Sequence, residues 1–302
     1  MPEAEKWPKA VERPRTAVGV PGWSESSGPC SFRTRRIFLR SDGSRLVWWS
    51  RHHRKSLRPP WEREALAAGS LILRCLWMPG ELNWWIGTVF ALGSFLFGLG
   101  SLLCLLPELA AAWSIDVRAT NMIFFSGSIP FTLAAYLQLF QAANSGDVSP
   151  ETGARVPPVR RILLGWEPRN IGWLSCAAQF VGTLFFNLNT FDPLIPGLTP
   201  AAQDLIVWTP DLFGSVLFLV SGYLAFAETA HAWWRWEPGN ISWWVTFTNL
   251  LGCVAFMLSA CFAFVPTQGP DPTAAFLSSA FTLLGAGGFL AGSLLMLPET
   301  AG

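Results

Sequence analysis

Charged residues are scarce in this sequence. They make up 14% of its 302 residues, whereas 51% of the residues are hydrophobic and the mean hydropathy is +0.35. A soluble domain carries about 25% charged residues, so the composition favours a membrane protein. The 17 Trp residues agree with this interpretation, because Trp concentrates at the membrane–water interface.

The motifs of common catalytic and metal sites are also missing. The three His and six Cys include no C-x-x-C pair and no metal-ligand spacing, which argues against a disulfide framework, a zinc site or a haem site. No P-loop, G-x-S-x-G or H-E-x-x-H motif occurs. Glu228 and His231 form one Glu-x-x-His, the spacing of di-iron bundles, but the chain holds no second copy. We therefore expect no catalytic residues, no cofactor and no metal.

Six long uncharged runs dominate the chain after residue 81. A helix rises about 1.5 Å per residue, so about 20 residues cross a hydrocarbon layer of about 30 Å. The fourth run is the shortest and reaches full length only if Glu228 and His231 lie near the head groups. The sequence predicts an all-α integral membrane protein with six transmembrane helices, at 84–106, 119–140, 171–191, 212–227, 241–265 and 273–297.

Basic residues are nearly absent from alternate loops between these runs. With a cytoplasmic N-terminus, 20 of the 21 Lys and Arg fall on the cytoplasmic side, and only Arg118 falls on the other side. Such a positive-inside bias predicts that both termini are cytoplasmic. The expected location is an inner or plasma membrane.

A spaced pattern of Trp, Pro, Gly and Phe recurs three times, at the start of the first, third and fifth helices. Its members are Trp77, Pro79, Trp84, Gly93 and Phe97; Trp166, Pro168, Trp173, Gly182 and Phe186; and Trp236, Pro238, Trp243, Gly252 and Phe256. The returning helices share a second pattern, with Gly127, Phe131 and Tyr136 in the first copy and Gly214, Phe218 and Tyr223 in the second. The third copy keeps Gly285 and Phe289, and five positions beyond the Tyr position stand Gln141, Glu228 and Glu299.

These patterns predict three two-helix repeats, at 77–143, 166–235 and 236–302, with a cytoplasmic loop at 144–165. An even number of spans in each unit makes the copies parallel. They can stand in a ring around a pseudo-threefold axis or in a row, and the sequence leaves this open. We interpret the Gly as helix-packing residues, the Trp as interface anchors and the Pro as first-turn residues. Asn170 and Asn240 are expected to satisfy free backbone donors.

The paired helices resemble the YrhK-like domain, a small two-helix membrane family without an established activity. Residues 123–131 and 212–218, which contain Phe-x-x-Gly-Ser or Phe-Gly-Ser followed by Phe, carry most of the likeness. The resemblance covers about residues 80–300, over which the two-helix unit is repeated three times. It implies no catalytic residues.

The N-terminal quarter is basic. Residues 1–30 are predicted to be a disordered tail, and 31–76 a cytoplasmic arm with a hairpin around Asp42-Gly43 and an interfacial helix at about 61–76. Two interpretations of its basic tract stay open: contact with anionic lipid head groups, or a solvated flank that sets topology. Nucleic acid is not expected as a partner. The tract comprises Arg51, His52, His53, Arg54, Lys55 and Arg58, of which the cations Arg51, Arg54, Lys55 and Arg58 are the candidate lipid contacts.

The interiors of the six runs contain no Asp, Glu, Lys, Arg or His, which argues against an ion-coupled pump. Gln179 and Asn249 share one repeat position near mid-membrane, where they form interhelical hydrogen bonds or line a solute path. We expect a non-enzymatic protein with a structural, lipid-binding or partner-binding role, and a small-solute carrier or channel is the alternative. A membrane enzyme is a third possibility. A carrier predicts a polar cavity at Gln179 and Asn249, and the oligomeric state stays open.

Overall fold

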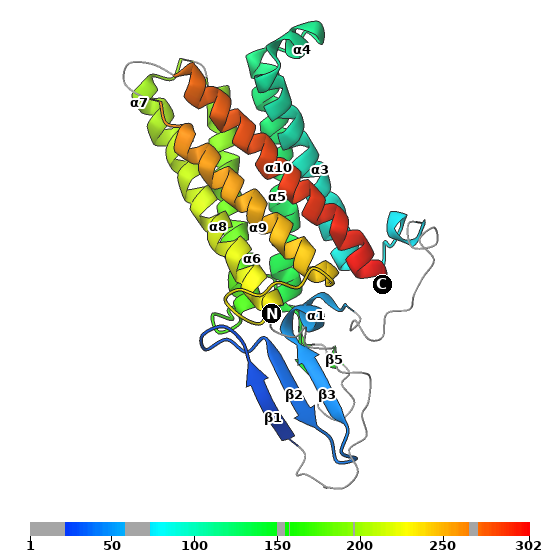
Figure 1. Cartoon of the computed structure of the whole chain (residues 1–302). Coiled ribbons are helices and arrows are strands. Elements are labelled where there is room, and N and C mark those ends of the chain that lie inside the picture. Colours follow the sequence, from blue (N-terminus) through cyan, green and yellow to red (C-terminus); the bar gives the residue numbers. More distant parts are fainter. Residues whose placement is uncertain (1–21, 58–72, 150–154, 157, 196, 266–270) are drawn as a thin grey trace.

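The computed structural model describes residues 22–57, 73–149, 155–156, 158–195, 197–265 and 271–302. Six long helices stand side by side as a bundle, with a small sheet beneath one end (Figure 1). We call this end the basal end and the opposite end the apical end. Six helical segments are long and apolar enough to cross a membrane, as the sequence predicts: Leu82–Leu105, Val117–Ala143, Ile171–Leu194, Ala201–Ala230, Ile241–Phe262 and Pro272–Ala301.

The long helices are joined by connections at the apical and basal ends. The long helices are α3 (Leu82–Leu105), α5 (Val117–Ala143), α6 (Ile171–Phe191), α8 (Thr209–Ala230), α9 (Ile241–Phe262) and α10 (Pro272–Ala301). The connections hold α4 (Pro107–Ala112), η2 (Asp192–Leu194), α7 (Pro200–Gln203), the π-helical segment η3 (Asp204–Trp208), and the two-residue strands β4 (Asp147–Val148) and β5 (Arg155–Val156). The fourth span is longer than the sequence suggests, because α7 and η3 extend α8 past Asp204 and Asp211 at its apical end.

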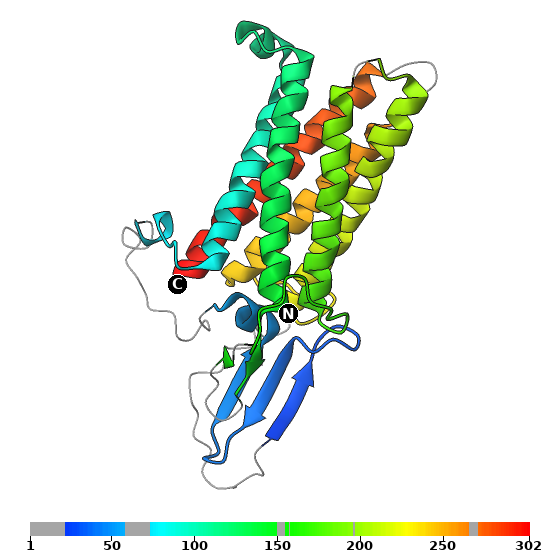
Figure 2. The same cartoon turned by 180° about the vertical axis from the view of Figure 1, so that it is seen from behind.

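The three repeats form a closed ring. Each helix packs against the next in the order α3, α5, α6, α8, α9, α10 and back to α3 (Figures 1 and 2). The contacts between α10 and α3 join the last repeat to the first. This closure decides between the ring and the row that the sequence left open, and it gives the bundle a central axis.

Glycine pairs hold the two helices of each repeat together. A Cβ atom at Gly93 would lie 2.6 Å from the Phe131 ring and 2.9 Å from the Gly127 carbonyl oxygen. Gly182 and Gly252 meet the carbonyl oxygens of the matching glycines in their own repeats at 3.2 and 3.0 Å. Backbones approach this closely only where no side chain intervenes, so these glycines let the two helices of a repeat come into direct contact.

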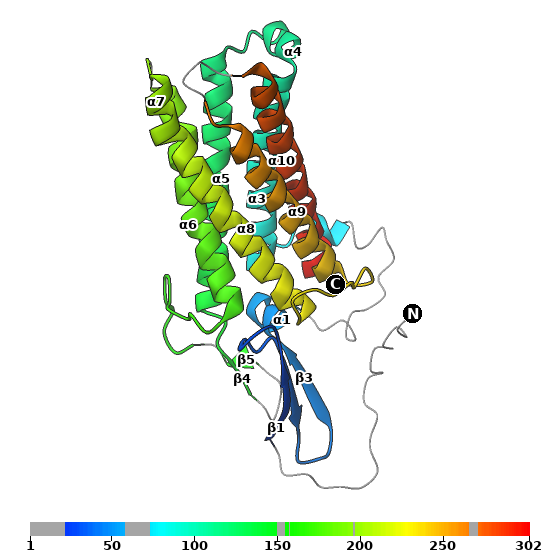
Figure 3. The same ribbon diagram turned by 60° about the vertical axis from the view of Figure 1, so that its left-hand side comes forward.

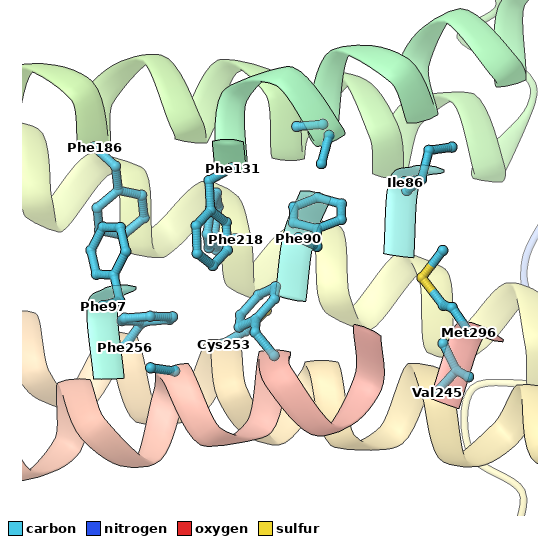
Figure 4. Packing of buried hydrophobic residues seen from close by; sticks show 14 residues of the cluster. Ile86, Phe90, Phe97, Phe131, Phe186, Phe218, Val245, Cys253, Phe256 and Met296 are labelled. Carbon is cyan, nitrogen blue, oxygen red and sulfur yellow. The ribbon is translucent and has the colours of Figure 1, made fainter. Parts of the chain in front are cut away.

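The repeated Phe residues meet on the axis of the ring. All six are buried, and the ring centroids of neighbours lie between 4.7 and 6.5 Å apart. Figure 4 shows the labelled members Phe97, Phe131, Phe186, Phe218 and Phe256 gathered between the helices. The void among the rings measures about 10 Å³, which is at or below the roughly 10–15 Å³ that one water needs. We call this dry constriction the phenylalanine collar; it comprises Phe97, Phe131, Phe186, Phe218, Phe256 and Phe289.

The two Trp of each motif have different environments, which corrects their common assignment as interface anchors. The second Trp of each motif is buried and donates its indole N–H to a carbonyl oxygen eight or nine residues earlier, as Trp243 does to Arg235 at 2.8 Å. The first Trp is exposed and packs edge-on against the second, with ring centroids 4.7 to 5.6 Å apart. The buried indole therefore fastens the preceding loop to the helix.

The motif Pro precedes its helix instead of lying in the first turn, which corrects the predicted position. The amide of Asn240 donates to the carbonyl of Glu237 at 3.0 Å, and Asn170 and Glu81 make the same turn in the other repeats. Pro238 therefore occupies the second position of a β-turn, where its fixed φ angle is favourable. The turn ends at the residue that caps the helix.

Asn170→Ala and Asn240→Ala are each expected to lower the free energy of unfolding by about 1 kcal/mol, because each Asn side chain accepts from the first backbone N–H groups of its helix. Thermal unfolding in detergent measures the change. Glu81→Ala is the matched control, since Glu81 caps α3 without a side-chain hydrogen bond. An equal loss in all three variants would contradict the assignment.

The N-terminal arm forms an antiparallel sheet. Strands β2 (Arg35–Leu39) and β3 (Arg45–Trp49) make the predicted hairpin, with Ile37 opposite Val47. A third strand, β1 (Gly22–Ser27), pairs with β2. It lies within the segment 1–30 that was predicted to be disordered, so that prediction is wrong for these residues. Trp23 holds β1 against the sheet, because its ring packs edge-on against Phe38 and under the guanidinium of Arg36. Residues 1–21 of the predicted tail lie outside the described residues. So does most of the predicted interfacial helix, because 58–72 are not described.

Candidate functional site at the basal end

A short helix lies between the sheet and the bundle. It is α1 (Ser50–Lys55), which follows β3 without a break and ends at Ser56 in the left-handed conformation. The amide of Ser50 donates to the carbonyl of Thr34 at 2.9 Å, so the sheet fixes where α1 begins. Figure 3 shows α1 directly under the basal ends of the long helices. It contacts α5, α6 and α8.

Three cations of α1 are buried in ion pairs with the bundle. The Arg54 guanidinium lies 2.7 Å from the Glu228 carboxylate of α8. Arg51 and Lys55 both bind the Glu299 carboxylate of α10, at 2.9 and 3.2 Å. Each of the five side chains is at most 5% exposed. We call these residues the basal ion cluster.

This arrangement corrects the two interpretations of the basic tract. Arg51, Arg54 and Lys55 are neither solvated nor available to lipid head groups, because their charged ends are enclosed by α8 and α10. Buried charges are tolerated when a partner compensates their desolvation, and the two glutamates balance the charge of two of the three cations. Arg58 lies outside the described residues.

Glu228 and Glu299 share one repeat position in the sequence, but no local sequence pattern connects them with the N-terminal arm. The third residue at that position, Gln141 of α5, is also buried, and its Oε1 atom has no hydrogen-bond partner in the described part of the chain. The sequence signal for these ion pairs was two acidic residues at matching basal helix ends together with a cationic tract elsewhere in the chain. Ser50, which donates to Glu228 at 2.9 Å, carried no signal in the sequence.

Glu228 and His231 of the Glu-x-x-His pair have separate sets of contacts. Glu228 is engaged by Arg54, whereas the His231 ring contacts the Thr34 hydroxyl at 3.0 Å and the sheet residue Trp49. Burial lowers the pKa of His231 to about 4, so the ring is neutral near pH 7. No group of three or more potential metal ligands occurs within the described ranges.

Lys55 titrates far below its ordinary range. Burial is the main cause, and the neighbouring Arg51 adds to it; Glu299 opposes both, and the resulting pKa is about 7. Above that pH the basal ion cluster holds two cations and two carboxylates. Below it, the cluster carries one more positive charge.

A cavity of about 40 Å³ lies between α1 and the phenylalanine collar. Such a volume accommodates roughly three water molecules. Arg51, Arg54 and Lys55 line its basal side, and Phe289 belongs to both the cavity wall and the collar. The remaining wall comes from α5, α6, α8, α9 and α10, so the cavity lies inside the ring.

The structure brings both predicted solute-path residues to this cavity. Gln179 of α6 and Asn249 of α9 line it together with the hydroxyls of Ser175 and Thr246. The Oδ1 atom of Asn249 has no hydrogen-bond partner among the described residues. By contrast, Asn187 is paired with Thr132 of α5 at 2.9 Å. The two Tyr of the repeat pattern do not line the cavity: Tyr136 packs on Phe180, and Tyr223 stacks on Trp233.

No family model matches the chain, and no significant match was found among curated proteins or solved structures.

Proposed function

We propose that this protein is a conduit for a small polar solute, with its path along the central axis of the ring. The observation that carries the proposal is the polar cavity shared by Gln179 and Asn249. A bundle with only a structural role gains nothing from a polar void on its axis, because buried polar groups cost free energy unless they are paired. The role needs no chemical step on the solute, in keeping with the expectation of a non-enzymatic protein.

In this proposal the structure represents a closed state. The collar blocks the apical side of the cavity, in the way that hydrophobic constrictions gate channels by excluding water. Helix α1 blocks the basal side through the basal ion cluster. Opening requires that α1 leave the bundle and that the phenylalanine rings separate.

We further infer that the basal end faces the cytoplasm of an inner or plasma membrane. The loop charges support this orientation, since Arg118 is the single basic residue on the predicted outer side. The likeness to the YrhK-like domain stays a prediction, and it is compatible with a conduit because that family has no established activity.

The double variant Glu228→Gln/Glu299→Gln is expected to raise solute flux, because neutral amides hold α1 less tightly than carboxylates do. Light scattering by proteoliposomes during osmotic swelling measures the entry of urea, glycerol, formate, nitrate and chloride. Adding Gln179→Leu and Asn249→Leu is expected to return the flux to the level of protein-free liposomes.

Asn187→Leu, added to the same double variant, is the matched control, because Asn187 pairs with Thr132 outside the cavity wall. It should leave the raised flux unchanged. If the folded double variant passes none of these solutes faster than protein-free liposomes, the conduit is wrong, and a structural or partner-binding role is the remaining alternative.

A further inference from the structure

The basal ion cluster carries an imbalance of charge at the cavity wall. Its three cations face two carboxylates, and among the described residues the third equivalent helix end offers the neutral Gln141. An excess charge in a buried site is costly unless a counter-ion compensates it. The cavity wall therefore carries one positive charge that no carboxylate of the cluster balances.

Donor groups at the cavity wall also lack acceptors. The Arg54 side chain lines the wall and is 5% exposed, and its Nε–H, which lies beside Gly172, has no hydrogen-bond partner in the described segments. The Lys55 ammonium has three N–H donors, and the described residues give it one acceptor, Glu299 at 3.2 Å. Free donors on cations are the groups that bind anions most strongly.

The amides on the wall are suited to an anion. Gln179 and Asn249 can donate N–H groups, whereas the Ser175 and Thr246 hydroxyls already donate to backbone carbonyl oxygens, at 2.9 and 3.1 Å. The volume limits the occupant to a few heavy atoms, because about 40 Å³ holds roughly three waters. This size excludes organic phosphates and dicarboxylates.

We propose that the cavity above α1 is a binding site for a small monovalent anion, of the size of chloride, nitrate or formate, held by Arg54 and Lys55. The proposal deepens the proposed function by naming the solute class, and only its transport aspect rests on that function. Binding at equilibrium is a separate property that does not require an open path.

Lys55 makes the expected affinity dependent on pH. The charged and titratable groups around it are Arg51 and Arg54 of α1, Glu299 of α10, Glu228 of α8 and Cys176 of α6. On the other packed elements, α5 presents the Gln138 amide to the cavity, and α9 presents an amide, a hydroxyl and the Cys253 thiol. With a pKa of about 7 for Lys55, the excess charge is present below pH 7 and disappears above it. Anion affinity should therefore fall by about tenfold for each pH unit above 7.

Titration of the full-length protein in detergent with potassium nitrate, chloride and formate, at constant ionic strength set by gluconate, tests the site. Calorimetry at pH 6 should show saturable binding of these anions, and sulfate should not bind. Lys55→Met should weaken binding by at least about tenfold, because it removes the excess charge. Lys55→Arg should retain binding and lose its pH dependence, since Arg stays charged.

Arg235→Met is the matched control, because Arg235 is a half-exposed cation that pairs with Glu237 away from the cavity wall. Lys55→Met keeps both Arg–Glu pairs, so a melting temperature at or above that of the wild type shows that it folds. No saturable binding, or equal binding by wild type and Lys55→Met, would overturn the anion site. Anion binding without solute flux would contradict only the proposed conduit function. Flux of neutral solutes without anion binding would contradict only the proposed anion site.

Discussion

Glu299→Ala is expected to detach α1 from the bundle and to lower the free energy of unfolding by about 3–5 kcal/mol. The substitution leaves Arg51 and Lys55 buried without their shared carboxylate, which lies 2.9 and 3.2 Å from them. The cost arises from the two stranded cations more than from the lost attraction. Thermal unfolding in detergent measures the stability, and limited proteolysis of the N-terminal arm measures the detachment.

Two further variants separate this cause from a general effect of losing a carboxylate. Glu237→Ala removes a partner from the more exposed pair with Arg235, at 3.4 Å, and should cost less than about 1 kcal/mol. The triple variant Arg51→Met/Lys55→Met/Glu299→Met removes the charges together and should recover most of the stability. If Glu299→Ala behaved like Glu237→Ala, the basal ion cluster would not hold the arm in place.

Gly252→Leu is expected to prevent correct assembly of the third repeat, and Gly252→Ala to cost about 1–3 kcal/mol through overpacking. Even the single Cβ atom of Ala would lie 2.8 Å from the Phe289 ring and 3.0 Å from the Gly285 carbonyl oxygen. The ring can rotate away, but the backbone oxygen moves only if α9 and α10 separate. Because Phe289 belongs to the collar, the damage reaches the axis.

Gly287 provides the matched control for this prediction. It lies on α10, two residues beyond Gly285, and a Cβ atom there would meet nothing within 4 Å. Gly287→Ala should be neutral or stabilising, because Ala is the better helix former by up to about 1 kcal/mol. Melting temperatures of the two Ala variants in the same detergent give the comparison. Equal melting temperatures would show that the glycine pairs do not set the distance between the helices.

The structure gives each residue of the repeat pattern a specific role. Pro238 forms a turn, Asn240 caps a helix and the Trp243 indole fastens the loop. Gly252 sets the helix spacing and Phe256 enters the collar. Each repeat thus contributes equally to an axis that is closed near its middle.

The sequence by itself determined the class, the span count and the repeat. Long uncharged, apolar runs favour helices in a hydrocarbon layer, because a helix satisfies its backbone hydrogen bonds within one segment. The hairpin around Asp42-Gly43 was likewise predictable, because turn chemistry is local. Gln179 and Asn249 were identifiable for the same reason, as polar residues at one repeat position in apolar helices.

Only the tertiary structure decided what the basic tract does and what the ring encloses. Arg54 and Glu228 are 174 residues apart, and Arg51 and Glu299 are 248 apart, so no local pattern joins them. A cation beside a membrane has the same sequence signal whether it binds a head group or a buried carboxylate. The choice depends on where β3 delivers α1, and therefore on the sheet and on the closure of the ring.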